Sequence, residues 1–475
     1  MKQLITIEPI TRIEGHARIQ LFLDDAGQVQ NARFQVTQFR GFEKFVEGRP
    51  FFEMPSLTAR TCGICPISHE LASAKACDQL LAVAIPETAK QLRRVLNLGQ
   101  IIQSHALSYF YLSAPDFLLG MDHPPASRNF FGLAAAHPQF ARDGIRLRQF
   151  GQQVIERLAG RRIHPAWVVP GGVRSPLDER ARDELLREIP TVKTLALDHL
   201  HRFKQSLEQH EEYIQIFAHF PSLFLGLTDR DGNLEHYDGG MRIIDPTGAL
   251  VVDHLAPSRY REVIDEAVEP WTFLKFPYYK PQGYPEGMYR VGPLARLNLA
   301  ARCGTELADQ ELLQFRSLVD GLHLGSFYAH YARLIEVVYA IEMIEKLLSD
   351  RAILDSTVRA VAGVNKCEGI GVTEAPRGTL IHHYRVNDDG LLEWANLIIA
   401  TGHNNLAMNR GILQAARRYL DGVTPREGLL NRIEAVIRAF DPCLACSTHA
   451  VGAMPLIVEV IGPDGSILGQ LQRDN

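Results

Sequence analysis

Two Cys-x-x-Cys pairs, one near each end of this 475-residue chain, restrict its possible folds more than any other feature. The pairs occupy residues 62–65 and 443–446, and a histidine follows each of them, at His69 and His449. Two residues between two cysteines allow both thiolates to face one ion from a single turn of the chain. One pair could be a redox dithiol or half of a metal site, whereas two pairs favour a site of four thiolates. Such a site requires a fold that brings the two ends of the chain together.

The wide separation of the two pairs distinguishes this site from a zinc knuckle. A structural zinc knuckle closes a loop of about 15–20 residues between its cysteine pairs. A site that draws on residues 62 and 443 belongs instead at the centre of a large domain. Thiolates are soft ligands that suit zinc, iron–sulfur clusters and nickel, so the cysteines alone leave the metal open.

The composition is that of an ordinary soluble globular protein, with 46% hydrophobic and 22% charged residues. The formal net charge of −5 gives no indication of nucleic-acid or anionic-membrane binding. No apolar run approaches the roughly 18 residues that span a bilayer, and the N-terminus does not resemble a signal peptide. Seven cysteines are too few for a disulfide scaffold. We therefore expect a cytoplasmic protein whose thiols are free to bind metal.

The periodicity of apolar residues predicts an α+β fold that is mostly helical, with long helices forming a central bundle. Strands are predicted at 4–7, 16–23 and 29–36, and again at 379–386 and 391–399. Helices are predicted after Pro66, at 86–119, at 183–219 with a kink or break at Pro190, at 306–349 with a break near Gly321 or Gly325, at 406–420 and at 429–440.

Two segments differ from this helical pattern. Glycine, proline, tyrosine and short apolar runs over residues 224–299 predict a β-rich insertion. After His449, residues 455–461 and 466–471 predict a hairpin across the turn Gly462–Gly465. We therefore expect one large domain over residues 1–449, followed by a C-terminal tail over residues 450–475.

Several compact motifs accompany the cysteines, and most of them combine charged residues with glycine or proline. They are Arg12-Ile13-Glu14-Gly15-His16, Arg40-Gly41-Phe42-Glu43, Arg60-Thr61 before Cys62, Pro170-Gly171-Gly172, Tyr289–Arg296, Glu374-Ala375-Pro376-Arg377-Gly378 and Asp441-Pro442 before Cys443. Together, and in this order, they resemble the large, catalytic subunit of nickel–iron hydrogenases. The resemblance runs from residue 12 to residue 449 and is closest to the soluble cytoplasmic type, within which we favour the bidirectional NAD-linked enzyme.

This resemblance implies a nickel–iron centre. The nickel would be held by Cys62, Cys65, Cys443 and Cys446. Cys65 and Cys446 would also bridge to an iron that carries carbon monoxide and cyanide ligands, and Pro376 would be among the residues that bind the cofactor. Splitting dihydrogen requires a metal that takes the hydride and a nearby base that takes the proton.

The resemblance also assigns roles around the metals. Arg377 would lie over them, where an electrostatic role is favoured because arginine almost never loses its proton. Asp116 and Asp441 would hold Arg377 by charged hydrogen bonds. Glu14 would be the first proton relay, because proteins can tune a carboxylate pKa towards neutrality. His69 would donate to the bridging sulfur of Cys65.

The sequence also predicts a site for a second cation and the surroundings of the three remaining cysteines. By resemblance, Glu43, His449 and the backbone carbonyl of Leu397 would bind Mg²⁺. The remaining cysteines have no motif, and we expect each to be buried in apolar surroundings: Cys77, Cys303 and Cys367.

The chain has no further cysteine-rich motif and no Gly-x-Gly-x-x-Gly loop between a strand and a helix, so we expect neither an iron–sulfur cluster nor NAD on it. The expected partners are an iron–sulfur small subunit, diaphorase-type NAD/flavin subunits and an endopeptidase that removes the tail after His449. Other acceptors, a deazaflavin coenzyme or a heterodisulfide reductase, remain alternatives. So do two other classes, a quinone-module subunit like that of respiratory complex I, which lacks the cysteine quartet, and a zinc-stabilised interaction protein.

Overall fold

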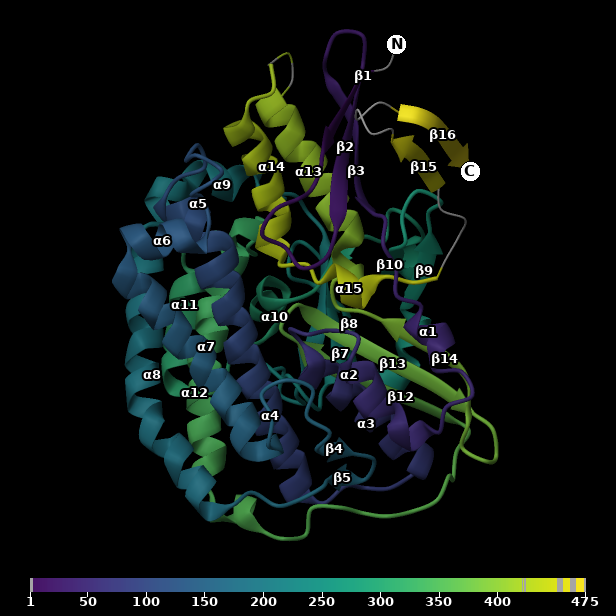
Figure 1. The fold of residues 1–475 in the computed structure, drawn as a ribbon. Coiled ribbons are helices and arrows are strands. Elements are labelled where there is room, and N and C mark those ends of the chain that lie inside the picture. Colours follow the sequence, from purple (N-terminus) through teal and green to yellow (C-terminus); the bar gives the residue numbers. More distant parts are fainter. Residues whose placement is uncertain (1–2, 421, 423, 451–455, 462–466, 474–475) are drawn as a thin grey trace.

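The computed structural model describes residues 3–420, 422, 424–450, 456–461 and 467–473 (Figure 1). Its long helices gather on the left of Figure 1. They are α4 (Glu87–Ala106), α7 (Pro138–Ala159), α8 (Glu179–Gln205) and α12 (Ala329–Ser349). α12 packs against both α4 and α8, and every residue from Ala329 to Ile341 is buried. The predicted helical bundle is confirmed, with α12 at its centre.

Helix α7 is the largest element that the sequence prediction missed. It packs closely along α4, and a Cβ added to Gly151 would lie 2.6 Å from the Gln103 backbone nitrogen of α4. Pro190 was predicted to kink or break its helix, and α8 continues through it without a break. The predicted break between 306 and 349 is confirmed, since α11 (Glu306–Arg316) ends well before α12 begins.

A three-stranded antiparallel sheet lies on the right of Figure 1. It consists of β12 (Glu368–Ala375), β13 (Gly378–Val386) and β14 (Leu392–Ile398). Helix α3 (Pro66–Leu81) packs against β12 and β13. The strands β13 and β14 were predicted, whereas β12 was not.

The N-terminal strands form a second antiparallel sheet in the order β1 (Gln3–Ile7), β2 (Ala17–Leu23) and β3 (Val29–Val36), as predicted. Helix α13 (Asn405–Leu420) packs against β3 and against α14 (Glu427–Phe440). The loop between β1 and β2 carries Arg12 and Glu14 towards the C-terminal cysteine pair.

The β-rich insertion is also confirmed. Its strands are β6 (Leu223–Thr228), β7 (Gly240–Ile244), β8 (Leu250–Leu255), β9 (Ile264–Val268), β10 (Lys275–Tyr279) and β11 (Tyr289–Arg290). They form one sheet in the order β11-β6-β7-β8 and a separate β9–β10 hairpin.

The remaining elements are short. They are α1 (Phe42–Phe45), α2 (Met54–Ala59), α5 (Ala114–Leu118), α6 (Phe130–Ala136), β4 (Val168–Val169), β5 (Gly172–Val173), α9 (Glu211–Ile216), α10 (Pro293–Leu299) and α15 (Leu444–Ser447). Among the described residues, no helix is both long and apolar enough to cross a membrane.

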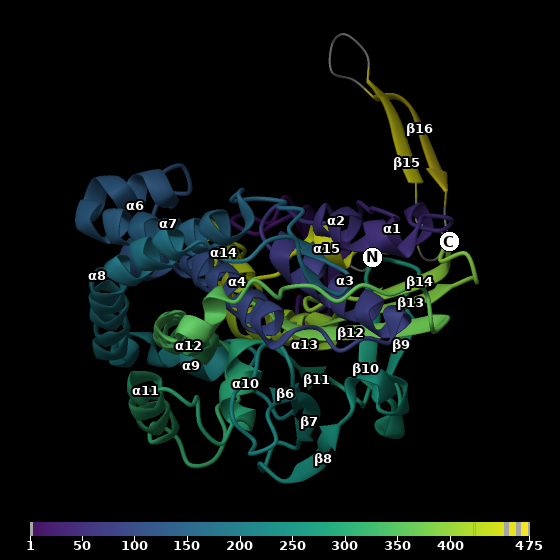
Figure 2. The same cartoon turned by 90° about the horizontal axis from the view of Figure 1, so that it is seen from below.

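The tail forms the antiparallel hairpin β15 (Leu456–Ile461) and β16 (Ile467–Arg473). Figure 2 shows this hairpin standing apart from the body of the protein. The predicted turn Gly462–Gly465 lies outside the described residues. The division of the chain at residue 449 stays a prediction.

Candidate metal centre

The fold brings the two cysteine pairs together, although they lie at opposite ends of the chain. Cys65 immediately precedes α3, whose first residue is Pro66, and Cys443 immediately precedes the short helix α15. The sulfur atoms of Cys62 and Cys443 are 3.3 Å apart, and those of Cys65 and Cys446 are 3.5 Å apart. All four sulfurs lie within 4.8 Å of one another and all four residues are buried.

The chemistry of this donor set fits a bound cation. Burial raises the pKa of the Cys443 and Cys446 thiols, whereas hydrogen bonds from the other three thiols lower that of Cys65. Four thiolates cannot share such a small buried space unless positive charge compensates them. A soft metal ion provides that charge, so the four cysteines fit the predicted nickel–iron centre.

Arg377 reaches this centre from the tight turn that joins β12 to β13. Its Nε donates to the Asp441 carbonyl at 2.5 Å, and its terminal nitrogens donate to the Asp441 carboxylate at 3.1 Å and to Ser104 Oγ at 3.2 Å. Burial lowers the pKa of Arg377, but Asp441 and the cysteine thiols outweigh burial and hold it well above its usual value. The guanidinium therefore stays charged, which favours an electrostatic role over that of a base.

A buried ionic network fixes the backbone on which Arg377 sits. Arg296 donates to the backbone carbonyls of Ala375 and Pro376, at 3.0 and 3.2 Å. The same guanidinium pairs with Glu336 of α12 at 2.6 Å and with Glu374 at 2.8 Å, and the side chains of all three charged residues are fully buried. The central helix is thus tied directly to the turn that carries Pro376 and Arg377.

Asp116 has a different position from the one predicted. Its carboxylate pairs with Arg12 and with Arg438, the latter at 3.1 Å, and accepts from Asn431 at 3.0 Å. Within the described residues no hydrogen bond joins it to Arg377, so the predicted contact is wrong. The sequence did not indicate that Arg12 and Arg438 would occupy this carboxylate. Asp116 instead fixes the loop that carries Glu14.

Glu14 lies beside the C-terminal cysteine pair. Its carboxylate accepts the backbone N–H of Ala445 at 3.0 Å, and its carbonyl accepts that of Leu444 at 3.2 Å. This approach requires glycine at position 15, where φ is +87° and a Cβ would lie 2.7 Å from the Leu444 Cβ.

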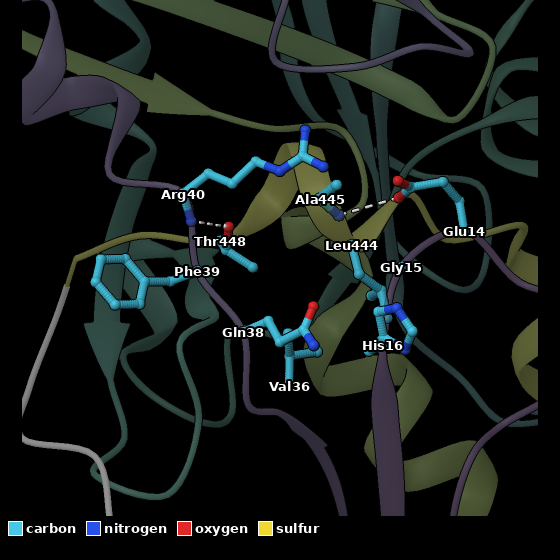
Figure 3. A pocket seen from close by; sticks show the side chains of 10 residues that line it. All are labelled: Glu14, Gly15, His16, Val36, Gln38, Phe39, Arg40, Leu444, Ala445 and Thr448. Atoms are coloured by element: carbon cyan, nitrogen blue, oxygen red, sulfur yellow. Dashed lines mark hydrogen bonds between the residues drawn. The ribbon is translucent and has the colours of Figure 1, made fainter.

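Glu14 also lines a cavity of about 280 Å³ (Figure 3). The cavity is bounded by the segment from Glu14 to His16, by residues between Val36 and Arg40, and by α15 with Thr448. Phe39, at its rim, is 52% exposed. Glu14 thus lies between the backbone of the C-terminal cysteine pair and a space that water can enter.

His69 lies one turn into α3, and its side chain helps to lower the pKa of the Cys65 thiol. Its Nδ1 lies 3.1 Å from His382 Nε2, and His382 Nδ1 lies 2.6 Å from the Tyr384 hydroxyl. Tyr384 in turn donates to Ser73 Oγ at 3.0 Å. This hydrogen-bonded chain is buried along its whole length and fixes the ring of His69 against the sulfur.

His382 and Tyr384 belong to no motif in the sequence. Their spacing in a strand places them on the same face of β13, and that alternation was the one signal available. Nothing in the sequence indicated that this face would lie against His69.

Glu43, Leu397 and His449 do lie together, but their arrangement does not fit a divalent ion. Glu43 accepts from His449 Nδ1 at 2.9 Å and from the backbone N–H of Leu397 at 2.8 Å. The ammonium group of Lys275 lies 3.4 Å from the same carboxylate. Burial raises the pKa of Glu43, but His449 and Lys275 lower it to about 2. The predicted magnesium site thus contains a positively charged side chain.

The three other cysteines lie outside the centre. Cys77 and Cys303 are buried as expected, whereas Cys367 is exposed, so the prediction for Cys367 is wrong. Among the described residues, the quartet is the one group of three or more histidine, cysteine or acidic side chains close enough to hold a metal together.

Comparison with known proteins gives consistent matches. A family model described as nickel-dependent hydrogenase matches residues 40–123 and 246–449, and one described as HoxL-like matches residues 4–39. The chain is 40% identical to the NAD-reducing hydrogenase HoxS subunit beta of Cupriavidus necator, with all of both chains covered. It is 38% identical to the vhc F420-non-reducing hydrogenase of Methanococcus voltae, covering 96% of this chain and 97% of the relative.

Solved structures agree with these sequence matches. A crystal structure of an NAD⁺-reducing [NiFe]-hydrogenase in the H2-reduced state superposes with a TM-score of 0.92 at 45% identity, covering 94% of this chain and 99% of the other. The Ni-Fe-Se hydrogenase of Desulfovibrio vulgaris Hildenborough shares the fold, with a TM-score of 0.75 at 22% identity over 94% of this chain and 100% of the other. With its four converging cysteines, the chain belongs to the nickel-dependent hydrogenase family.

Proposed function

We propose that this chain is the catalytic subunit of a hydrogenase that splits dihydrogen heterolytically and reversibly, and that its electrons reach NAD through partner subunits. The observation that carries the proposal is the convergence of four buried thiols beside the charged Arg377 and the carboxylate of Glu14. The sequence identity to an NAD-reducing hydrogenase subunit supports NAD as the acceptor.

In this proposal Cys62, Cys65, Cys443 and Cys446 would hold the nickel–iron centre, with Cys65 and Cys446 as ligands of both metals. The iron would carry carbon monoxide and cyanide ligands, and Pro376 would be among the residues that bind the centre. When bound, such a centre supplies the Lewis acidity that polarises dihydrogen.

The protein's own groups have separate tasks. Arg377, held by Asp441, provides a fixed positive charge over the centre. Glu14 receives protons on the cysteine side and passes them towards the cavity that it lines. His69, held by His382, would orient the Cys65 sulfur.

Electron transfer requires further subunits. Among the described residues, the four cysteines are the one group close enough together to hold a metal. In this proposal the catalytic centre uses all four of them, so none is left for an iron–sulfur cluster. We therefore propose that the direct electron acceptor is an iron–sulfur subunit, with diaphorase-type NAD/flavin subunits beyond it. We also propose that the enzyme works in the cytoplasm, where a reducing environment keeps the seven thiols free.

Metal analysis and infrared spectroscopy of the purified complex test the proposal. We expect nickel and iron together, with absorption bands in the carbon monoxide and cyanide stretching region, and reduction of NAD⁺ by dihydrogen. Substitution of any cysteine of the quartet, for example Cys446→Ala, should abolish turnover, whereas Cys367→Ser should not. Zinc alone, or turnover that survives Cys446→Ala, would contradict the proposal. If the complex reduced a deazaflavin or a heterodisulfide reductase in place of NAD⁺, the proposed acceptor would be wrong and the proposed dihydrogen cleavage would stand.

A further inference from the structure

The ammonium group of Lys275 occupies a cluster of oxygen atoms beside the metal centre. Its Nζ lies 2.9 Å from Asn396 Oδ1, 3.4 Å from Glu43 Oε1 and 3.5 Å from Glu266 Oε1. An ammonium group donates but cannot accept. Here it donates to Asn396 and to Glu43, and Glu266 Oε1 lies within ion-pair distance. The Lys275 side chain is only 14% exposed, so water provides little alternative solvation.

The residues around Lys275 hold it in this position. Asn396 is oriented by its own amide, which donates to Glu266 Oε2 at 2.8 Å. The Lys275 carbonyl accepts from Asn405 Nδ2 at 2.5 Å, which fixes the start of β10. Two carboxylates thus face one ammonium, and removing it would take from Glu266 its ion-pair partner and leave Glu43 with the His449 ring, in a mostly buried site.

The same cluster fastens the C-terminal arm of the protein, defined here as residues 447–449. The His449 ring contacts Glu43, and the His449 backbone N–H donates to the Phe273 carbonyl at 2.9 Å. Thr448 pairs with Leu274, the residue before Lys275. The segment that leads into β10 therefore binds the arm, and the first residue of β10 supplies the ammonium.

A magnesium ion would need about six oxygen ligands at 2.0–2.1 Å in octahedral geometry. Here one Glu43 oxygen contacts the imidazole, the other accepts the Leu397 N–H, and Lys275 lies against them. A divalent cation would have to displace the ammonium or be repelled by it, since both would share one carboxylate.

We propose that the Lys275 ammonium replaces a divalent cation in joining the C-terminal arm to Glu43 and Glu266. The arm then docks without Mg²⁺. The inference concerns a structural cation, so it stands apart from the proposed turnover and from the choice of electron acceptor.

Thermal unfolding of the full-length chain, with and without a chelator, tests this proposal. The wild-type melting temperature should be unchanged by EDTA and by millimolar Mg²⁺. In Lys275→Ala the oxygen cluster loses its cation, so the melting temperature should fall and added Mg²⁺ should restore at least part of the loss. Lys280→Ala is the matched control, because Lys280 is half exposed and its ion pair with Asp265 spans 3.9 Å. It should behave as the wild type does.

Crystals soaked in Mn²⁺ give a second, direct measurement. We expect an anomalous peak between Glu43, Glu266 and Asn396 in Lys275→Ala and none there in the wild type. A wild-type peak at this position, or a wild-type protein that EDTA destabilises, would overturn the proposal. So would a Lys275→Ala protein as stable as the wild type in EDTA. If Lys275→Ala cannot be purified, Lys275→Arg should fold without metal and Lys275→Met should not, and equal behaviour of these two would also overturn it.

Discussion

At the scale of single residues, Glu14 contacts both the segment that carries the C-terminal cysteines and a cavity. It lies between the C-terminal cysteine pair, whose backbone it binds, and a cavity of about 280 Å³. Arg377, in contrast, is held by Asp441 in its charged form and cannot readily accept a proton. We therefore propose an electrostatic role for Arg377 and proton transfer for Glu14.

Glu14→Gln keeps the size of the side chain and an oxygen for the Ala445 N–H, but it removes the titrating group. We expect nickel and iron contents like those of the wild type and a steady-state turnover lower by about 10²–10⁴-fold. Dihydrogen–deuterium exchange and metal analysis on the same sample separate proton transfer from metal loading. The control is Glu47→Gln, which removes a surface carboxylate paired with Lys44. Turnover near wild type in Glu14→Gln would place the relay elsewhere.

At the scale of elements, β13 supports the centre through its buried face. His382 and Tyr384 extend the hydrogen-bonded chain from Cys65 and His69, while His383, on the opposite face, contacts Tyr260 and Glu368. Burial lowers the pKa of His382 well below its usual value, so its ring stays neutral. A neutral ring has a single N–H, and the chain therefore holds His69 in one orientation.

His382→Phe keeps an aromatic ring but leaves His69 and Tyr384 without this partner. We expect a loss of about 10–100-fold in activity or metal affinity, the usual effect of removing a group that orients a metal ligand. A shift of the carbon monoxide and cyanide bands would distinguish a change at the centre from simple destabilisation. His383→Phe is the matched control, with unshifted bands expected. Bands that move equally in both variants would remove the special role of His382.

The contact between α12 and the turn of Arg377 depends on a buried ion pair. Glu336 binds Arg296 and lies 2.7 Å from His105, all within the protein interior. Glu336→Gln leaves the Arg296 charge with Glu374 alone and should lower the free energy of unfolding by about 3–5 kcal/mol. Urea unfolding measures this loss. Glu345→Gln, on the same helix, removes a carboxylate that is 39% exposed and should cost no more than about 1 kcal/mol.

The local sequence pattern predicted the helices and strands that have one buried and one exposed face, or whose ends are marked by proline or by a turn. The strands β1 to β3 alternate between buried and exposed positions or end in turns, and α3 begins at Pro66. Strand β12 was missed because all but its first residue are buried, so it shows no alternation. Pro190 was predicted to break or kink α8, yet the helix continues through it, because packing against α12 outweighs the local cost.

At the scale of the whole molecule, the cysteine spacing predicted that the two ends of the chain meet, and the sulfur distances confirm it. Contacts between charged side chains were harder to predict, because the tertiary fold decides which arginine lies next to which carboxylate. Asp116 binds Arg12 and Arg438 rather than Arg377, and Lys275 comes from a strand more than a hundred residues away from both Glu43 and His449. Motifs thus located the site but did not predict all of its ionic pairs.

The C-terminal tail, residues 450–475, is also a question of how the whole molecule packs. His449 is buried and Ala450 is exposed, which agrees with the predicted end of the body at His449. The cysteines already converge with the tail attached, and β15 and β16 pair only with each other among the described strands. Removing residues 450–475 should therefore cost the body little stability.

We predict that a dedicated endopeptidase cleaves after His449 once nickel is bound. Intact-mass measurement of the active, nickel-loaded enzyme should give a C-terminus at His449, while nickel-free material should keep the full chain. Cys446→Ala provides the control, because a chain that cannot complete its thiolate quartet should accumulate uncleaved. Active, nickel-loaded enzyme that still ends at Asn475 would show that the hairpin is a permanent part of the fold.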